Sequence, residues 1–266
     1  MGNRYADIIR EVFLRKYRKN AACVAFHRDD CVQAAEKLGF DRIKNLGDIV
    51  YSFRFRTELP EEITKTAPKG CEWVIVGSGV GQYEFRLGKA CKISLTTNRE
   101  QIKILDATPE IVGKYMPGRD EQALLTRVRY NRVVDIFTGL TCYSIQNHFR
   151  TTVDGIGQIE VDEIYIGISR SGAHYVLPCQ AKSPNDKFGI VQVMQDIALC
   201  RERYPNALCR PIAMQFLGDG VFGLLELKVN EGKYLELVVV DEKHYHLVKK
   251  GALTNDELKT YAHREK

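Results

Sequence analysis

Polar side chains interrupt two apolar segments in the middle of the chain. Residues 158–168 and 174–182 are rich in branched apolar residues and alternate like strands, with a short polar turn between them. The polar residues that stand out on them are, in order, Glu160, Asp162, Glu163, Gln180 and Lys182. Polar side chains are uncommon on strands that are otherwise apolar, and a functional site is one explanation for them.

The spacing of these residues predicts which of them share a face. Alternate residues of a strand point the same way, so Glu160 and Asp162 share one face and Glu163 points opposite. Gln180 and Lys182 share a face of the next strand. Acids in strands and a lysine two residues after a glutamine also arise by chance. The hairpin spacing, the apolar surroundings and the helix that directly follows Lys182 favour a site here.

These residue types suit the hydrolysis of a phosphodiester. That reaction needs a metal ion, an activated water and stabilisation of negative charge on phosphorus. Magnesium prefers oxygen ligands and retains several waters, so two or three protein oxygens suffice. Asp162, Glu160 and the Gln180 carbonyl would supply them. Lys182 would orient and acidify the water and offset phosphate charge.

A neutral glutamine is a weaker ligand than a carboxylate, so another acid should compensate for it. Glu160 is the first candidate for this acid. Glu163 is the second, if a bulge turns it inward. Asp135 or Glu121, from the predicted helical segment before the hairpin, is the third.

Periodicity predicts the elements that position these residues. Helices are expected over residues 3–19, 28–38 and 41–53, then within 119–149, broken near Gly139, and over 187–203. Strands besides the two above are expected over residues 72–77, 83–87, 90–97, 101–105, 210–217, 221–229, 234–240 and 244–249. The segments 72–77 with 83–87, and 90–97 with 101–105, are expected to form strand pairs.

A Pro- and Gly-containing stretch near residues 110–118 predicts a boundary between two domains, 1–112 and 113–266. The N-terminal helices followed by strands suit a helix-turn-helix or winged-helix unit that recognises DNA or dimerises. A plain helical cap would give the same pattern. The second domain would carry the chemistry.

Composition is typical of a folded protein without a membrane span. The 266 residues are 44% hydrophobic and 27% charged, with a net charge of +5. That positive balance leans toward a polyanionic partner. No run of apolar residues is long enough for a membrane span, and a signal peptide is not evident, so a cytoplasmic location is expected. The eight cysteines form no CxxC pair and are expected to be free thiols rather than zinc ligands.

Residues 157–200 resemble the catalytic core of the PD-(D/E)XK nuclease superfamily, in its D…QxK variant, as in Mrr-like restriction enzymes. The resemblance extends to residues 129–153. It implies an α/β (α+β) fold with a restriction-endonuclease-like core, a mixed sheet flanked by helices. Two departures from the name-giving pattern stand out. No proline precedes Asp162, and Gln180 replaces the acid.

Carried onto this chain, the resemblance makes Asp162 a metal ligand, Gln180 a second ligand and Lys182 the catalytic lysine. The implied cofactor is Mg²⁺, with Mn²⁺ as a substitute. The implied activity is that of an endonuclease on double-stranded DNA, of type II-like restriction character. A restriction role further implies a homodimer and a cognate DNA methyltransferase in the cell.

Basic and amide residues around the hairpin are candidates for contacts with DNA. They are Arg127, Arg129, Arg132, Asn147, Arg150, Lys187 and Gln192. Solvated helix faces would explain the arginines equally well. Two other functions stay open: a repair, junction-resolving or mobile-element nuclease of the same fold, and a DNA-binding protein with an inactive nuclease core.

Overall fold

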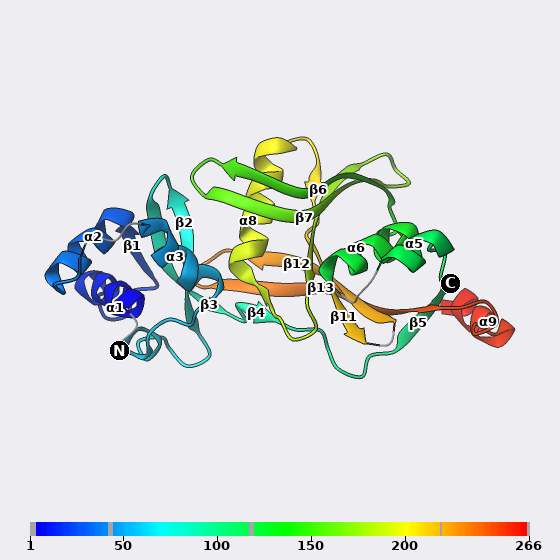
Figure 1. Cartoon of the computed structure of the whole chain (residues 1–266), viewed down its shortest axis with the longest axis horizontal. Coiled ribbons are helices and arrows are strands. Elements are labelled where there is room, and N and C mark those ends of the chain that lie inside the picture. The colour runs from blue at the N-terminus through cyan, green and yellow to red at the C-terminus, as the bar shows by residue number, and fades with distance from the viewer. Residues whose placement is uncertain (1–3, 42–44, 117–119, 219, 265–266) are drawn as a thin grey trace.

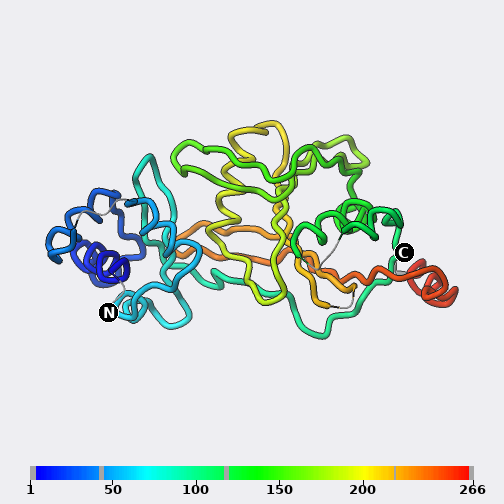
Figure 2. The backbone as a smooth tube through the Cα atoms, in the orientation of Figure 1, coloured from blue at the N-terminus to red at the C-terminus, as the bar shows by residue number. Residues whose placement is uncertain are grey.

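The computed structural model describes residues 4–41, 45–116, 120–218 and 220–264. The molecule is elongated, with its first helix at one end and its last helix at the other (Figures 1 and 2). A large mixed sheet flanked by helices runs between them, so the predicted mixed α/β class is confirmed. None of the helices within these ranges is both long and apolar enough to cross a membrane.

The N-terminal end combines helices with three strands of the sheet. The elements are α1 (Arg4–Lys16), β1 (Cys23–His27), α2 (Arg28–Lys37), α3 (Leu46–Phe55), α4 (Glu61–Thr64), β2 (Glu72–Gly79) and β3 (Gln82–Lys89). β3 lies between β1 and β2 and is antiparallel to both, as the predicted hairpin requires. The helix expected over 28–38 is confirmed as α2, and the one expected over 3–19 is confirmed over Arg4–Lys16, with residue 3 outside the described residues. Residues 42–44, within the helix expected over 41–53, lie outside the described residues.

The remaining elements build the rest of the sheet and its helical cover. The strands are β4 (Lys92–Ile93), β5 (Gln101–Leu105), β6 (Thr141–Val153), β7 (Gly157–Ile168), β8 (His174–Lys182), β9 (Phe188–Gly189), β10 (Leu208–Cys209), β11 (Ile212–Gly218), β12 (Val221–Asn230) and β13 (Leu235–Val248). The helices are α5 (Glu110–Tyr115), α6 (Glu121–Tyr130), α7 (Val133–Thr138), α8 (Ile190–Arg203) and α9 (Asn255–Arg264).

The main path through the sheet is β1-β3-β13-β12-β11-β8-β7-β6, in which β8 and β11 are parallel. Helices cover opposite faces of it. On β11, Met214 belongs to the core cluster that includes α6 and α7, whereas its neighbour Ala213 belongs to the cluster that includes α8. Because successive strand residues point to opposite faces, α6 and α7 lie on one side of the sheet and α8 lies on the other.

The structure corrects three of the predicted elements. Residues 141–149, expected to be helical, form most of β6, because the chain leaves the helix at Gly139 with positive φ and then pairs with β7. Residues 90–97 and 101–105 do not pair with each other, since β4 pairs with β9 and β5 pairs with β13. The two strands expected within 234–249 are one, β13, which shifts register against β12 instead of ending.

One core cluster gathers α1, α2, α3 and most buried residues of the N-terminal strands. Val76 of β2, Cys91 and Leu95 belong instead to the cluster under α8. β5 joins the C-terminal part of the sheet because β13 is long enough to pair with both β3 and β5. The chain over 91–105 therefore packs with C-terminal elements, although the predicted boundary at 112 assigned it to the first domain. Residues 117–119 of the expected linker lie outside the described residues.

Candidate functional site

Asp162 lies where β7 and β8 separate. The pairing of these strands ends at Glu163 and Cys179, and β8 continues by pairing with β11 as far as Lys182. The Asp162 carboxylate then accepts a hydrogen bond of 2.8 Å from the backbone N–H of Ala181. Asp162 and Lys182 thus both lie just beyond the point where the pairing of β7 with β8 ends.

The surroundings of Asp162 shift its ionisation. Burial raises the pKa of this carboxyl, and the Ala181 N–H and the charge of Lys182 oppose the rise. The charge of Glu121, at the start of α6, raises the pKa further, and His148 lowers it. Glu121, the third-ranked compensating acid, is therefore close enough to act on Asp162. A cation beside the two carboxylates would relieve their repulsion.

Lys182 ends β8 half-buried, and no hydrogen bond or ion pair engages its ammonium in the described part of the chain. Gln215, its neighbour on β11, fixes the following turn. The Gln215 amide donates to the carbonyl oxygens of Ser183 (2.5 Å) and Asp186 (2.8 Å). The Ser183 hydroxyl in turn donates to Glu121 over 3.5 Å. These contacts link the turn after Lys182 to the start of α6.

Gln180 is buried against α8. Its amide N–H donates to the Asp196 carboxyl at 3.0 Å and to the Glu160 carbonyl at 3.2 Å. Its own carbonyl oxygen accepts a hydrogen bond of 2.8 Å from the Gln192 amide. The oxygen predicted to bind a metal is therefore occupied by Gln192, a residue predicted to contact DNA.

Asp196 is an acid enclosed in the middle of α8. Burial raises the pKa of this carboxyl well above its ordinary value, against the Gln180 N–H that stabilises its charged form. The charge of Asp162 raises the pKa further and that of Lys182 lowers it. Asp196 thus shares the electrostatic environment of Asp162 and Lys182.

The other two hairpin acids turn toward other partners. Glu160 is exposed and pairs with Arg150 at 3.1 Å. Glu163 is fully buried, accepts hydrogen bonds from Arg129 (2.8 Å) and Ser144 (2.6 Å), and keeps its second oxygen unpartnered. The structure therefore pairs the side chain of each of these acids with an arginine. Across the described ranges, no group of three or more His, Cys, Asp or Glu side chains is arranged to hold a metal ion.

The candidate DNA contacts fall into two groups. Three arginines form ion pairs with acids. Arg129 pairs with Glu163, Arg150 with Glu160, and Arg132 with Asp135. Asn147 accepts a hydrogen bond of 3.0 Å from Arg129. Two residues have fewer partners. Lys187 is exposed, and the buried Nε of Arg127 has no acceptor among the residues that the structure describes.

Two residues of this region were not predicted from the sequence, Gln215 and Ser144. Gln215 is a buried glutamine in the apolar strand β11, the same signal that singled out Gln180. Ser144 lies in the segment that was predicted to be helical, where its side chain could not be placed facing Glu163. Comparison of the chain with models of protein families, with curated proteins and with solved structures gave no match.

Proposed function

We propose that the protein is a magnesium-dependent endonuclease of the PD-(D/E)XK type that hydrolyses double-stranded DNA, most simply as a type II-like restriction enzyme. The observation that carries the proposal is the placement of Asp162 and Lys182 on diverging neighbouring strands, with Glu121 acting on the same carboxylate. A carboxylate pair and an unpaired ammonium are what phosphodiester hydrolysis needs from a protein.

The residues of the site fit magnesium, with a changed ligand set. Asp162 and Glu121 would hold the ion, because one or two carboxylates with retained waters satisfy Mg²⁺. The Gln180 carbonyl oxygen accepts a hydrogen bond from Gln192 in this arrangement, so the proposed ligand set does not depend on it. When bound, the metal would polarise the phosphate and lower the pKa of water. Lys182 would hold the attacking water and stabilise the phosphate charge.

The N-terminal unit supports a DNA-binding role. Its element order is helix, strand, helices and a β2–β3 hairpin, with β3 between β1 and β2, as expected for a winged helix. A homodimer would set two active sites on the two strands of a palindrome. A cytoplasmic enzyme with this activity would need a cognate methyltransferase to protect cellular DNA.

Cleavage of plasmid DNA by the full chain tests the proposal. In magnesium, the wild type should cut supercoiled plasmid, and Asp162→Asn and Lys182→Ala should lose roughly a hundredfold or more of the rate. Both variants should keep their affinity for DNA. Lys228→Ala, which removes an exposed lysine from β12, is the matched control and should cut like wild type.

End mapping of the products separates the candidate biologies. Discrete fragments support restriction, and a smear or a preference for branched DNA supports the repair, junction or mobile-element alternative. Binding without cleavage in either magnesium or manganese would show an inactive core and overturn the proposal.

A further inference from the structure

A row of aromatic rings and guanidinium groups runs from the N-terminal core to the surface of α3. Tyr83 of β3 stacks on Phe26 with ring centroids 5.4 Å apart. The Arg54 guanidinium lies 6.0 Å from the Tyr83 centroid and 5.0 Å from that of Phe55. The row continues from Phe55 to Tyr51 and ends at Arg56. We call Tyr51, Arg54, Phe55, Arg56 and Tyr83 the aromatic–arginine row.

The outer part of the row is open to solvent. Phe55 and Tyr51 have centroids 5.0 Å apart, and the Arg56 guanidinium lies 4.8 Å from the Tyr51 centroid. The residues Tyr51 and Phe55 are 45% and 39% exposed. The core face of α3 is supplied by other residues, Ile49, Val50 and Phe53, which are buried. The exposed rings are therefore not needed to pack the helix.

The two arginines of the row lack compensating acids. Elsewhere in the N-terminal unit, Arg10 pairs with Glu62 and Arg15 with Asp30. Arg54 and Arg56 have no ion pair or side-chain hydrogen bond within the described residues, and the buried Nε of Arg54 has no acceptor. Burial lowers the pKa of Arg54, and the phenol groups of Tyr83 and Tyr51 oppose that decrease. A partly buried cation without an acid is stabilised by a bound anion.

Flat exposed rings and free guanidinium donors together match one class of partner. Successive bases of a single strand stack on aromatic side chains, and arginine donates to the phosphates between them. Bases within a duplex are already stacked and present only their edges. An acidic peptide would satisfy the guanidinium groups but would leave the rings uncovered.

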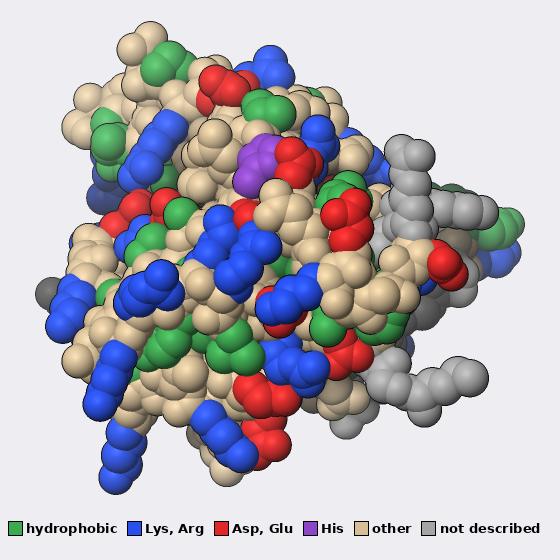
Figure 3. Space-filling model, turned by 90° about the vertical axis from the view of Figure 1, so that its left-hand side faces the viewer, with side chains coloured by type: hydrophobic (Ala, Val, Ile, Leu, Met, Phe, Trp, Pro, Cys, Tyr) green, Lys and Arg blue, Asp and Glu red, His purple; other side chains and the backbone are tan. Residues whose placement is uncertain are grey.

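We propose that the aromatic–arginine row binds unpaired nucleotides of DNA, with bases stacked on Tyr51 and Phe55 and phosphates bound by Arg54 and Arg56. Figure 3, which views the molecule from its N-terminal end, shows many lysine and arginine side chains over that end. Their charge would draw a strand toward this unit.

The proposal deepens the nuclease function and rests on it only for the choice of DNA over RNA. A nuclease whose N-terminal unit holds unpaired nucleotides would act where a single strand joins a duplex. The row therefore favours the repair, junction or mobile-element role over restriction of plain duplex DNA.

The test measures fluorescence anisotropy with the full-length Lys182→Ala protein in EDTA, so that neither cleavage nor metal is involved. The probes are a labelled oligothymidylate, an abasic strand of equal length and a blunt duplex of equal length. Oligothymidylate should bind at least roughly tenfold more tightly than the abasic strand, because stacking is lost without bases. Failure of the nuclease proposal would leave this result unchanged.

Variants locate the binding surface. Tyr51→Ala and Phe55→Ala should each weaken oligothymidylate binding by roughly fivefold or more, with little effect on the abasic strand. Tyr115→Ala is the matched control, since Tyr115 is also an exposed ring beneath a cation, Lys114, and should bind like the parent. Thermal melting should show that all of these variants are folded.

A second pair of variants tests the phosphate contacts. Arg56→Gln should weaken binding to both single strands and reduce its dependence on salt. Lys233→Gln, which removes a cation over Tyr234, is the control. Equal affinity for the abasic strand, tighter binding of the duplex through these same residues, or competition by polyglutamate as strong as by oligothymidylate would each overturn the proposal.

Discussion

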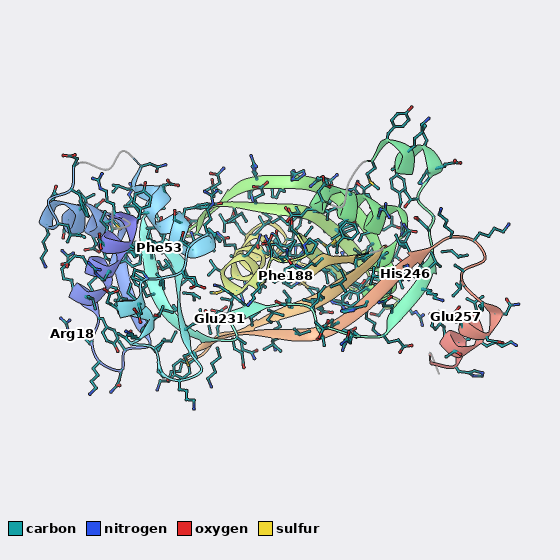
Figure 4. All side chains as sticks on the ribbon, turned by 60° about the horizontal axis from the view of Figure 1, so that its bottom comes forward. Arg18, Phe53, Phe188, Glu231, His246 and Glu257 are labelled. Atoms are coloured by element: carbon teal, nitrogen blue, oxygen red, sulfur yellow. The ribbon has the colours of Figure 1, made fainter. Side chains whose placement is uncertain are left out.

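The amide of Gln180 donates to the buried carboxyl of Asp196 over 3.0 Å. This contact gives a physical reason for a glutamine rather than an acid at this position of β8. A glutamate there would face Asp196 in a buried environment, and two carboxylates so placed cannot both ionise without a large penalty. The carboxyl group of this buried pair thus lies on α8, the yellow helix beside the label of Phe188 in Figure 4, and the amide lies on β8.

We expect Gln180→Glu to destabilise the fold and Asp196→Asn to restore it. The single variant should lose about 3 kcal/mol of unfolding free energy, because it adds an unpaired buried carboxylate. The double variant Gln180→Glu/Asp196→Asn exchanges the two groups and should recover most of the loss. Urea titration near neutral pH measures both, and Gln146→Glu, on the exposed part of β6, is the control. A fully stable single variant would refute the explanation.

We expect Glu121→Gln to impair cleavage more than Glu160→Gln. The charge of Glu121 raises the pKa of Asp162, whereas Glu160 is exposed and paired with Arg150. Loss of the Glu121 charge should reduce the cleavage rate by roughly a hundredfold and raise the magnesium concentration required. Glu160→Gln should stay within a fewfold of wild type. The reverse order would restore Glu160 as the compensating acid, as the sequence alone predicts.

Breaking the pair between Arg129 and Glu163 should destabilise the protein strongly. Arg129→Met leaves a fully buried carboxylate without its cation and should cost roughly 3–5 kcal/mol of unfolding free energy. Adding Glu163→Gln should recover part of that cost. Arg150→Met breaks the exposed pair with Glu160 and should change stability by about 1 kcal/mol or less. Equal effects of the two arginine variants would contradict the difference in burial.

Asp30→Asn should destabilise the N-terminal unit at neutral pH but not in acid. Burial alone would raise the pKa of Asp30, but hydrogen bonds from Lys16 and the His27 backbone, with the charges of Lys16 and Arg15, hold it below its ordinary value. A lowered folded pKa gives stability above the unfolded pKa, and this stability is lost as pH falls through the folded value.

The unfolding free energies of wild type and Asp30→Asn should therefore differ by about 1–2 kcal/mol at pH 7. This difference should shrink as the pH falls toward about 3. Thermal melting across this range measures the difference. Asp29→Asn, at a more exposed acid of the same helix turn, is the control. If the difference in stability between wild type and Asp30→Asn did not change with pH, the ion pairs of Asp30 with Lys16 and Arg15 would not be its source.

The sequence alone was sufficient for those elements whose signals are local. The stripe of Ile8, Ile9, Val12 and Phe13 predicts α1, and alternation predicts β7 and β8 with their polar residues. It failed for β6, because residues 141–149 continue a helical pattern and only the pairing with β7 makes them a strand. It also failed for the partners of β4 and β5, which are distant in the sequence.

The chain therefore determines by itself which polar residues stand on the hairpin strands, since side-chain alternation is a property of each strand. The tertiary structure decides which of them act together. It brings Glu121 toward Asp162, gives Glu163 to Arg129 and sets Asp196 against Gln180. These partners come from helices on both faces of the sheet, and their positions depend on long-range packing that local periodicity does not encode.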